Sequence, residues 1–179
     1  MPASDSRRVF FALWPDPAVA ESLATVASKA HALCGGRIMR VETVHLTLAF
    51  IGDIAATRIE RLVQAASLVT GDAFCLCLDR FGCWRRNHIV WAGASEPPLP
   101  LLALVGQLNE RLSDAGLPFD ARDFAAHLTL LRNARCLPLP QFEAIAWPVA
   151  EFVLAESQLS ASGAAYTVIG RWPLTPAIG

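Results

Sequence analysis

The tetrapeptide His-Leu-Thr-Leu occurs twice in this 179-residue chain, at residues 45–48 and 127–130, although the chain has only four histidines. Side chains alternate across a β-strand, so the histidine and threonine of each copy share one face and the leucines share the other. Each copy is therefore predicted to anchor itself in a core through its leucines and to present an imidazole beside a hydroxyl. The repetition of this polar pair indicates one site built from two halves.

Two imidazoles and two hydroxyls in one cleft suit phosphodiester chemistry without a metal ion. An imidazole titrates near pH ~6.5, so one histidine can accept a proton while the other donates one. Displacement at phosphorus needs a base on the entering oxygen and an acid on the leaving oxygen, and His45 and His127 supply these from opposite sides. The hydroxyls of Thr47 and Thr129 can bind the non-bridging oxygens, where negative charge builds up.

Other interpretations of these residues stay open. A histidine in an apolar strand is often a satisfied core or edge residue, and threonine is common in strands. Two histidines could also be two ligands of a metal ion, but such a site needs a third ligand. Neither histidine is followed two or four positions later by an acidic residue that could supply it. The remaining histidines are interpreted as non-catalytic: His31 lies near the C-terminus of the first predicted helix, where a positive charge is favourable, and His88 is interpreted as solvated.

The bulk composition indicates one folded domain over residues 1–179. Hydrophobic residues make up 54% and charged residues 17% of the chain, and no apolar run approaches the roughly 18 residues that span a bilayer. The formal net charge of −1 excludes a global basic field that would attract a long polyanion. Recognition of an anion must therefore be local, and a small end-group ligand fits this better than a long duplex.

The five cysteines are irregularly spaced, and the opening residues do not read as a secretory signal. We therefore predict a cytoplasmic protein with reduced thiols. Cys75 and Cys77 fall on one face of a predicted strand, and together with Cys83 they offer the alternative of a thiol- or zinc-dependent site. Because the matching second pair of such a site is missing, we interpret them as small buried hydrophobic residues.

Strands and helices mix without the strict alternation of a parallel sheet, which favours an α+β fold with mainly antiparallel sheets. Helical spacing of apolar residues predicts helices over 16–33, with Asp16 as N-cap, over 55–69, and around 101–112. The run 133–148, with its prolines, is predicted to be a loop. Strands are predicted over residues 7–15, 44–52, 73–81, 87–94, 125–132, 151–159 and 165–174. The two-fold repeat predicts two similar lobes that face each other.

The paired motifs and their flanking residues resemble the 2H phosphoesterase superfamily, and most closely its RNA 2′,3′-cyclic phosphodiesterase branch, also called the 2′-5′ RNA ligase (LigT-like) family. The resemblance covers nearly the whole chain. "RVFFALWP" resembles the opening strand of the family, "HLTLAFIGD" and "HLTLLR" resemble its two motifs, and residues 154–174 resemble its closing strands.

This resemblance implies a bilobal fold, with two pseudo-symmetric lobes of mainly antiparallel sheet, helices packed outside and a central cleft. It implies that a 2′,3′-cyclic phosphate at the end of an RNA or nucleotide is opened to a 2′-phosphate without metal or cofactor. In that analogy His45 donates a proton to the leaving 3′ oxygen, His127 activates water, and Thr47 and Thr129 hold the phosphate. Reversible 2′-5′ RNA ligation at the same residues and a non-catalytic RNA-end binding module are the alternatives.

Three further residues are predicted to bind substrate. Arg132 lies five residues after His127, which places it on the opposite strand face unless the strand bends or ends there. Arg8 and Phe10 share a face of the first strand and offer a cation and a stacking ring, although core packing explains Phe10 equally well. The arginine-rich run 79–88 is interpreted as a solvated hairpin tip, with RNA contact as the alternative. We expect a monomer without an obligate protein partner, because one chain holds both halves of the site.

Overall fold

The computed structural model describes residues 5–160 and 163–176. Its helices are the α-helices Pro17–Cys34 (α1), Ile59–Ser67 (α2) and Leu99–Asp114 (α3) and the 3-10 helices Val41–Thr43 (η1) and Ala56–Arg58 (η2). Its strands are Ser6–Leu13 (β1), Arg37–Ile38 (β2), Leu46–Ala55 (β3), Phe74–Leu78 (β4), Arg80–Trp84 (β5), Ile89–Gly93 (β6), His127–Arg132 (β7), Ile145–Val149 (β8), Glu151–Ser160 (β9) and Gly163–Pro173 (β10).

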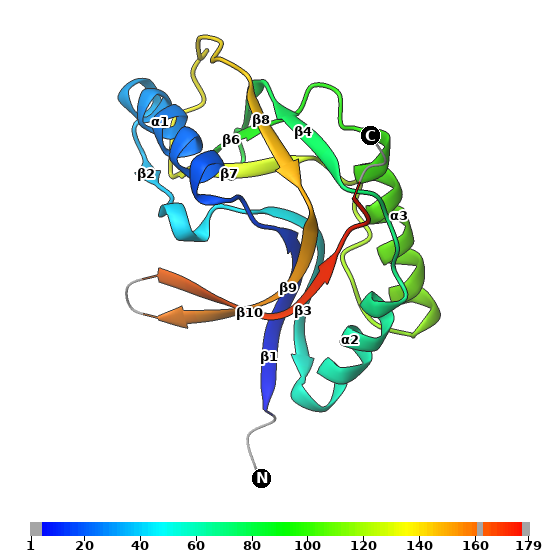
Figure 1. Cartoon of the computed structure of the whole chain (residues 1–179). Coiled ribbons are helices and arrows are strands. Elements are labelled where there is room, and N and C mark those ends of the chain that lie inside the picture. Colours follow the sequence, from blue (N-terminus) through cyan, green and yellow to red (C-terminus); the bar gives the residue numbers. More distant parts are fainter. Residues whose placement is uncertain (1–4, 161–162, 177–179) are drawn as a thin grey trace.

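Most strands belong to one large sheet with the order β10-β9-β1-β3-β7-β6-β5, and β2 joins this sheet by pairing with β7 (Figure 1). β4 and β8 form a separate two-stranded sheet. The pairings between these strands are antiparallel. The predicted α+β fold with mainly antiparallel sheets is therefore confirmed.

The large sheet consists of two lobes that meet at the two sequence motifs. β3 and β7 are registered through the pair Leu46 and Leu128, which are the second residues of the two His-Leu-Thr-Leu copies. Equivalent residues that face each other in an antiparallel pair are related by a local two-fold axis. The first lobe contains β1, β3, β9 and β10, and the second contains β2, β5, β6 and β7, as the predicted pair of similar lobes requires.

Helix α1 begins and ends where the sequence predicts. The side chain of Asp16 accepts a hydrogen bond from the backbone N–H of Val19 at 2.9 Å, and Pro17 is the first helical residue. The helix ends at Gly35, whose φ of +62° lies in the left-handed region that glycine adopts at little cost. The N–H of Gly35 donates to the carbonyl of His31, so the end of the helix is closed by its own backbone.

The longer helices cross from one lobe to the other. α1 follows β1 of the first lobe but contacts β2 and β7 of the second, whereas α3 follows β6 of the second lobe and contacts β3 of the first (Figure 1). α3 also packs beside α2. As its spacing predicts, α3 buries Leu101, Leu104, Val105, Leu108 and Leu112. This exchange of helices ties the two lobes to each other.

Two boundary predictions are wrong. The run 133–148 is irregular only to residue 144, because Ile145–Val149 form β8 along β4. β8 pairs with β4 alone in the described chain, and a strand with an unpaired edge tolerates a proline such as Pro148. The predicted strand 73–81 is two strands, since the chain leaves the small sheet at Asp79, whose carboxylate accepts the N–H of Ser95.

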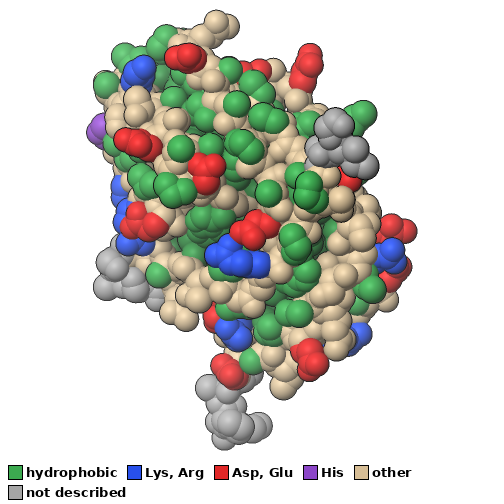
Figure 2. All heavy atoms as spheres, viewed as in Figure 1, with side chains coloured by type: hydrophobic (Ala, Val, Ile, Leu, Met, Phe, Trp, Pro, Cys, Tyr) green, Lys and Arg blue, Asp and Glu red, His purple; other side chains and the backbone are tan. Residues whose placement is uncertain are grey.

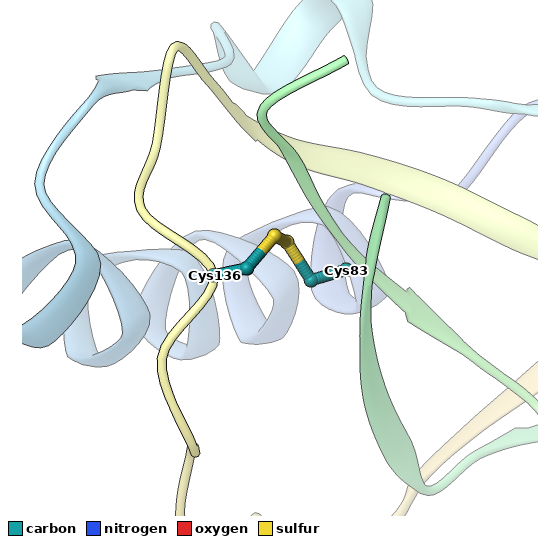
Figure 3. The surroundings of a disulfide bond; sticks show 2 residues. All are labelled: Cys83 and Cys136. Atoms are coloured by element: carbon teal, nitrogen blue, oxygen red, sulfur yellow. A yellow bond between two sulfur atoms is a disulfide. The ribbon is translucent and has the colours of Figure 1, made fainter. Parts of the chain in front are cut away.

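Two predictions for the cysteines are also wrong: Cys83 is not a reduced thiol, and Cys75 and Cys77 are not buried. A disulfide joins Cys83 in β5 to Cys136 in the loop that follows β7 (Figure 3), so these two are not free thiols. Cys75 and Cys77 share one face of β4, but they are exposed, because the two leucines that alternate with them take the core side. With the third thiol in a disulfide and no cluster of three metal-ligating side chains in the described residues, the three do not form a zinc site.

The surface carries charges of both signs. On the face shown in Figure 2, acidic and basic side chains are intermingled with hydrophobic ones, in keeping with the net charge of −1. Within the described part of the chain, no helix is both long enough and apolar enough to cross a membrane.

Candidate active site

Both sequence motifs open onto one cavity of about 640 Å³. It is lined by the two histidines and two threonines that the repeat predicts to share a site, and by the predicted substrate-binding residues Arg8, Phe10 and Arg132. The other lining residues are Arg37, Met39, Arg40, Thr43, Phe50, Ser157, Gly163, Ala164 and Tyr166. Because these residues come from both lobes, the cavity is a cleft at the lobe junction.

Arg132 reaches the cavity because β7 contains a β-bulge. Leu131 and Thr129 face successive residues of β6, so Leu130 is an extra residue in the pairing. Leu130 and Leu131 are accordingly both buried, and the alternation of side chains shifts by one position. Arg132 therefore returns to the face that carries His127. The strict alternation assumed from the sequence places it on the wrong face.

Strand β3 has the same irregularity at the same position of its motif. Thr47 and Ala49 face successive residues of β1, which leaves Leu48 as the extra residue. The next residue, Phe50, is thereby turned into the cavity, where its side chain is 38% exposed. Phe50 was missed by the sequence analysis, although the sixth positions of "HLTLAF" and "HLTLLR" are equivalent. One lobe thus presents an aromatic ring where the other presents Arg132.

The two histidines are held by equivalent hydrogen bonds. Nδ1 of His45 lies 2.8 Å from the carbonyl oxygen of Thr43, and Nδ1 of His127 lies 2.7 Å from that of Ala125. A carbonyl only accepts, so each Nδ1 carries a proton and donates it. Nε2 is then the nitrogen that each neutral imidazole offers as a base, or that each imidazolium offers as an acid.

Aromatic rings surround His45. Its ring centroid lies 4.7 Å from that of Phe10, 5.0 Å from that of Trp14 and 5.1 Å from that of Tyr166. The Trp14 indole is nearly parallel to the imidazole, at 18°, and the Tyr166 ring meets it edge-on. These rings fix the plane of the imidazole and remove it from water. Trp14 and Tyr166 were not predicted as site residues.

The pKa values of both histidines are lowered. Burial lowers the pKa of His45 to about 4, and the positive charges of His127 and Arg132 act in the same direction, while the hydrogen bond to Thr43 opposes them. Burial also lowers the pKa of His127, opposed by its bond to Ala125. Both imidazoles are therefore neutral at pH 7 unless an anion lies beside them, and a bound phosphate raises both pKa values.

His127 is packed against tryptophans of the second lobe. The ring centroid of Trp84 lies 4.4 Å from that of His127, and Trp91 lies 6.1 Å away, both edge-on. Gly82 provides the space for Trp91, because a Cβ atom there would lie 1.9 Å from the indole. Trp84 ends β5, whereas the turn at residues 85–88 is exposed and does not line the cavity.

Arg8 and Phe10 occupy different depths of the cleft. Phe10 is only 3% exposed and packs on the imidazole of His45, so most of its surface is used for packing. Arg8 is exposed, with its guanidinium carbon 5.5 Å from the Phe50 ring centroid and a nitrogen 3.8 Å from the Asp53 carboxylate. Phe50 therefore exposes more of its ring to the cleft than Phe10 does, and the Arg8 guanidinium lies over that ring.

The cleft is locally positive although the chain is not. Its described lining contains four arginines and neither aspartate nor glutamate. Arginine binds phosphate oxygens through several directed N–H groups, and a low-dielectric cleft strengthens such contacts. This agrees with the expectation that anion recognition by this chain is local.

Comparison with known proteins places these features in a family. The family model for LigT-like phosphoesterases matches residues 13–91. RNA 2′,3′-cyclic phosphodiesterase of Escherichia coli strain K12 is 32% identical over 96% of this chain and 99% of its own length. The enzyme of the same name from Archaeoglobus fulgidus is 28% identical over 73% of this chain and 75% of its own.

The solved structures agree with the sequence relatives. The crystal structure of Escherichia coli LigT complexed with 3′-AMP superimposes with a TM-score of 0.86 and 32% identity, and covers 95% of this chain and 99% of the LigT chain. This chain and Escherichia coli LigT thus share more than 30% of their residues over nearly their full lengths, and they share the same fold. The chain therefore belongs to the LigT-like phosphoesterase family.

Proposed function

We propose that this protein hydrolyses 2′,3′-cyclic phosphate ends of RNA or nucleotides to 2′-phosphomonoesters, by a metal-independent mechanism that uses two histidines. One observation carries the proposal: the lobes deliver two imidazoles to one arginine-lined cleft, each with Nδ1 bound to a carbonyl and Nε2 left for the substrate. The names of the relatives, RNA 2′,3′-cyclic phosphodiesterases, support the same substrate class.

The proposed reaction is a single displacement at phosphorus. Nε2 of neutral His127 accepts a proton from water as the water oxygen forms a bond to phosphorus. The bond from phosphorus to the 3′ oxygen breaks, and Nε2–H of protonated His45 gives its proton to that oxygen. The products are a 2′-phosphate and a 3′-hydroxyl, and proton exchange with solvent restores the two imidazoles.

The remaining site residues are assigned to binding. We assign the phosphate oxygens to the hydroxyls of Thr47 and Thr129, which make no hydrogen bond elsewhere in the described structure, and to Arg132. Arg8 contacts the nucleotide from the rim of the cleft, and Phe10 forms the cleft wall that supports His45.

The pKa values set a requirement for this assignment. A proton donor with a pKa near 4 is neutral at pH 7, so His45 must gain its proton when the anionic substrate binds. The negative charge of the cyclic phosphate beside the imidazole supplies the driving force. Substrate binding and protonation of the acid are thus coupled.

The proposal includes a single-domain, cytoplasmic monomer, in which the Cys83–Cys136 disulfide is an exception to the reduced thiols usual in that compartment. One chain supplies both histidines, so the reaction needs no second subunit. RNA, the proposed substrate, is made and processed inside the cell.

The test uses a short RNA with a 2′,3′-cyclic phosphate end, incubated with the protein in excess EDTA. We expect turnover that EDTA does not reduce, with the phosphate retained on the 2′ oxygen. Adding an RNA with a 5′-hydroxyl end detects ligation at the same site as a longer product. Binding of the cyclic end without turnover would instead support the RNA-end binding module.

A further inference from the structure

The cleft contains more positive charge than one phosphate group needs. Arg132 lines the same cavity as the two histidines. Two further arginines, Arg37 and Arg40, line the same cavity from the segment that precedes the first motif. The proposed hydrolysis gives these two no role.

Arg37 is held directly opposite Arg132. β2 pairs with the end of β7 in a register that sets Arg37 against Arg132. Like charges directly opposite each other in a sheet are destabilising. Neither guanidinium has an acidic partner within residues 5–160 and 163–176. An anion that lies between or beside the two would pair with both positive charges.

The backbone enforces the close approach of these two arginines. Gly36 has a φ of +84°, and a Cβ atom there would lie 2.6 Å from the carbonyl oxygen of Arg132. A residue with a side chain would push β2 away from β7 at this point. Glycine therefore lets Arg37 stand beside Arg132 despite their charges.

Arg40 extends the positive surface toward the first lobe. Its guanidinium donates a hydrogen bond of 2.7 Å to the carbonyl oxygen of Ala164 in β10. The nearest carboxylate, that of Glu42, is 4.0 Å away and exposed, which is the limit of an ion pair and contributes little in water. The positive charge of Arg40 therefore lies at the wall of the cleft, where its side chain links the start of η1 to β10.

We propose that Arg37, assisted by Arg40, forms a second phosphate subsite, which binds the internal phosphodiester on the 5′ side of the terminal nucleotide. Two guanidiniums on adjacent strands suit two successive phosphates, with Arg132 on the cyclic phosphate and Arg37 on the next one. The preferred substrate is then an oligonucleotide of at least two residues rather than a cyclic mononucleotide. This inference rests on the proposed function.

The test compares three substrates: a 2′,3′-cyclic mononucleotide, a dinucleotide with the same cyclic end, and that dinucleotide with a neutral methylphosphonate as its internal linkage. For the wild type we expect kcat/KM to be about 10-fold or more higher for the natural dinucleotide than for either other substrate, since a charge-assisted hydrogen bond stabilises by about that factor. In Arg37→Gln the preference for the charged linkage should fall to about two-fold or less, mainly through KM.

The controls distinguish the loss of this subsite from misfolding and from a change in the overall charge of the protein. Lys29→Gln removes one exposed positive charge on α1, outside the cavity lining, and should keep the wild-type preference. Arg37→Lys should restore part of the preference, because lysine keeps the charge but not the planar fork. Equal kcat/KM of the wild type for charged and neutral linkages would overturn the second subsite and leave the proposed function standing. No turnover of any of the three would defeat the proposed function itself.

Discussion

His45 and His127 make the same backbone hydrogen bond and differ in their surroundings. His45 lies among three aromatic rings of the first lobe, whereas His127 meets the edges of two tryptophans of the second. The motifs themselves do not say which imidazole gives a proton and which takes one. That distinction is a property of the environment, and it is open to a kinetic test.

Replacing the proton donor should matter least when the leaving group needs no proton. We expect His45→Ala to lower kcat/KM for a cyclic phosphate by about 10²–10⁴-fold, but by far less for an aryl phosphodiester with a weakly basic leaving group. His127→Ala should lower both by similar factors, because the attacking water must be activated in each case. The reverse pattern would exchange the two roles.

The pH dependence of the reaction should shift when substrate binds. Catalysis requires one protonated and one neutral imidazole, and both pKa values are lowered in the free protein. The bell-shaped profile of kcat/KM should therefore be centred below pH ~6.5, and that of kcat should lie at higher pH, because bound phosphate raises the pKa values. Steady-state rates between about pH 4 and pH 9 measure both profiles. An optimum for kcat/KM at or above that for kcat would contradict the coupling of binding and protonation.

At the scale of elements, a β-bulge in each motif strand decides which residues reach the cleft. The bulges at Leu48 and Leu130 bring the sixth residue of each hexapeptide, Phe50 and Arg132, onto the catalytic face. Alternation along the sequence correctly gave the faces of the histidines and threonines, which precede the bulges. It failed for the sixth position, because a bulge arises from pairing with a distant strand and leaves no local signal.

Arg132 should act mainly through the reacting phosphate. We expect Arg132→Gln to lower kcat/KM for the cyclic mononucleotide by about 10-fold or more, as expected when a charge-assisted contact to phosphate is lost. The same variant should weaken inhibition by inorganic phosphate. If Arg132→Gln binds phosphate and turns over substrate like the wild type, the bulge has no catalytic consequence and the residue is structural.

The disulfide joins the β5–β6 hairpin to the loop after β7. Cys83 and Cys136 are separated by 53 residues, and a cross-link of that span typically stabilises by about 2–4 kcal/mol, by restricting the unfolded chain. Cys136→Ser should lower the free energy of unfolding by that amount in urea titrations without reductant. Added reductant should destabilise the wild type to the same level and leave Cys136→Ser unchanged. A wild type insensitive to reductant would show that the cross-link does not form.

At the scale of the whole molecule, the buried imidazole makes stability depend on pH. The unfolded chain protonates His45 near pH ~6.5, whereas the folded protein resists protonation until about pH 4. The unfolded state binds more protons in this window, so stability falls as pH drops from 6.5 toward 4, by about 2–3 kcal/mol from this residue. Urea unfolding at both ends of the window should show a smaller fall in His45→Gln. An equal fall in variant and wild type would mean that His45 is not desolvated.

Those parts of the overall architecture that depend on local sequence patterns could be predicted from the sequence. The N-cap of α1 and the apolar spacing of α1 and α3 predicted those helices, and the repeated motif predicted the two lobes. What the sequence could not give depends on contacts between distant segments. The pairing of Cys83 with Cys136, the β8 strand in a proline-rich run and the position of Arg37 opposite Arg132 are examples.

The most direct test of the account measures whether the two histidines act as one catalytic unit. kcat/KM for an RNA with a 2′,3′-cyclic phosphate end would be compared among the wild type, His45→Asn, His127→Asn and the double variant. Each single substitution should cost about 10²–10⁴-fold, and the double variant should be about as slow as the slower single one, because either loss already abolishes the shared mechanism. Retention of the wild-type rate within about 10-fold by either single variant, or losses that multiply in the double variant, would contradict the two-histidine mechanism.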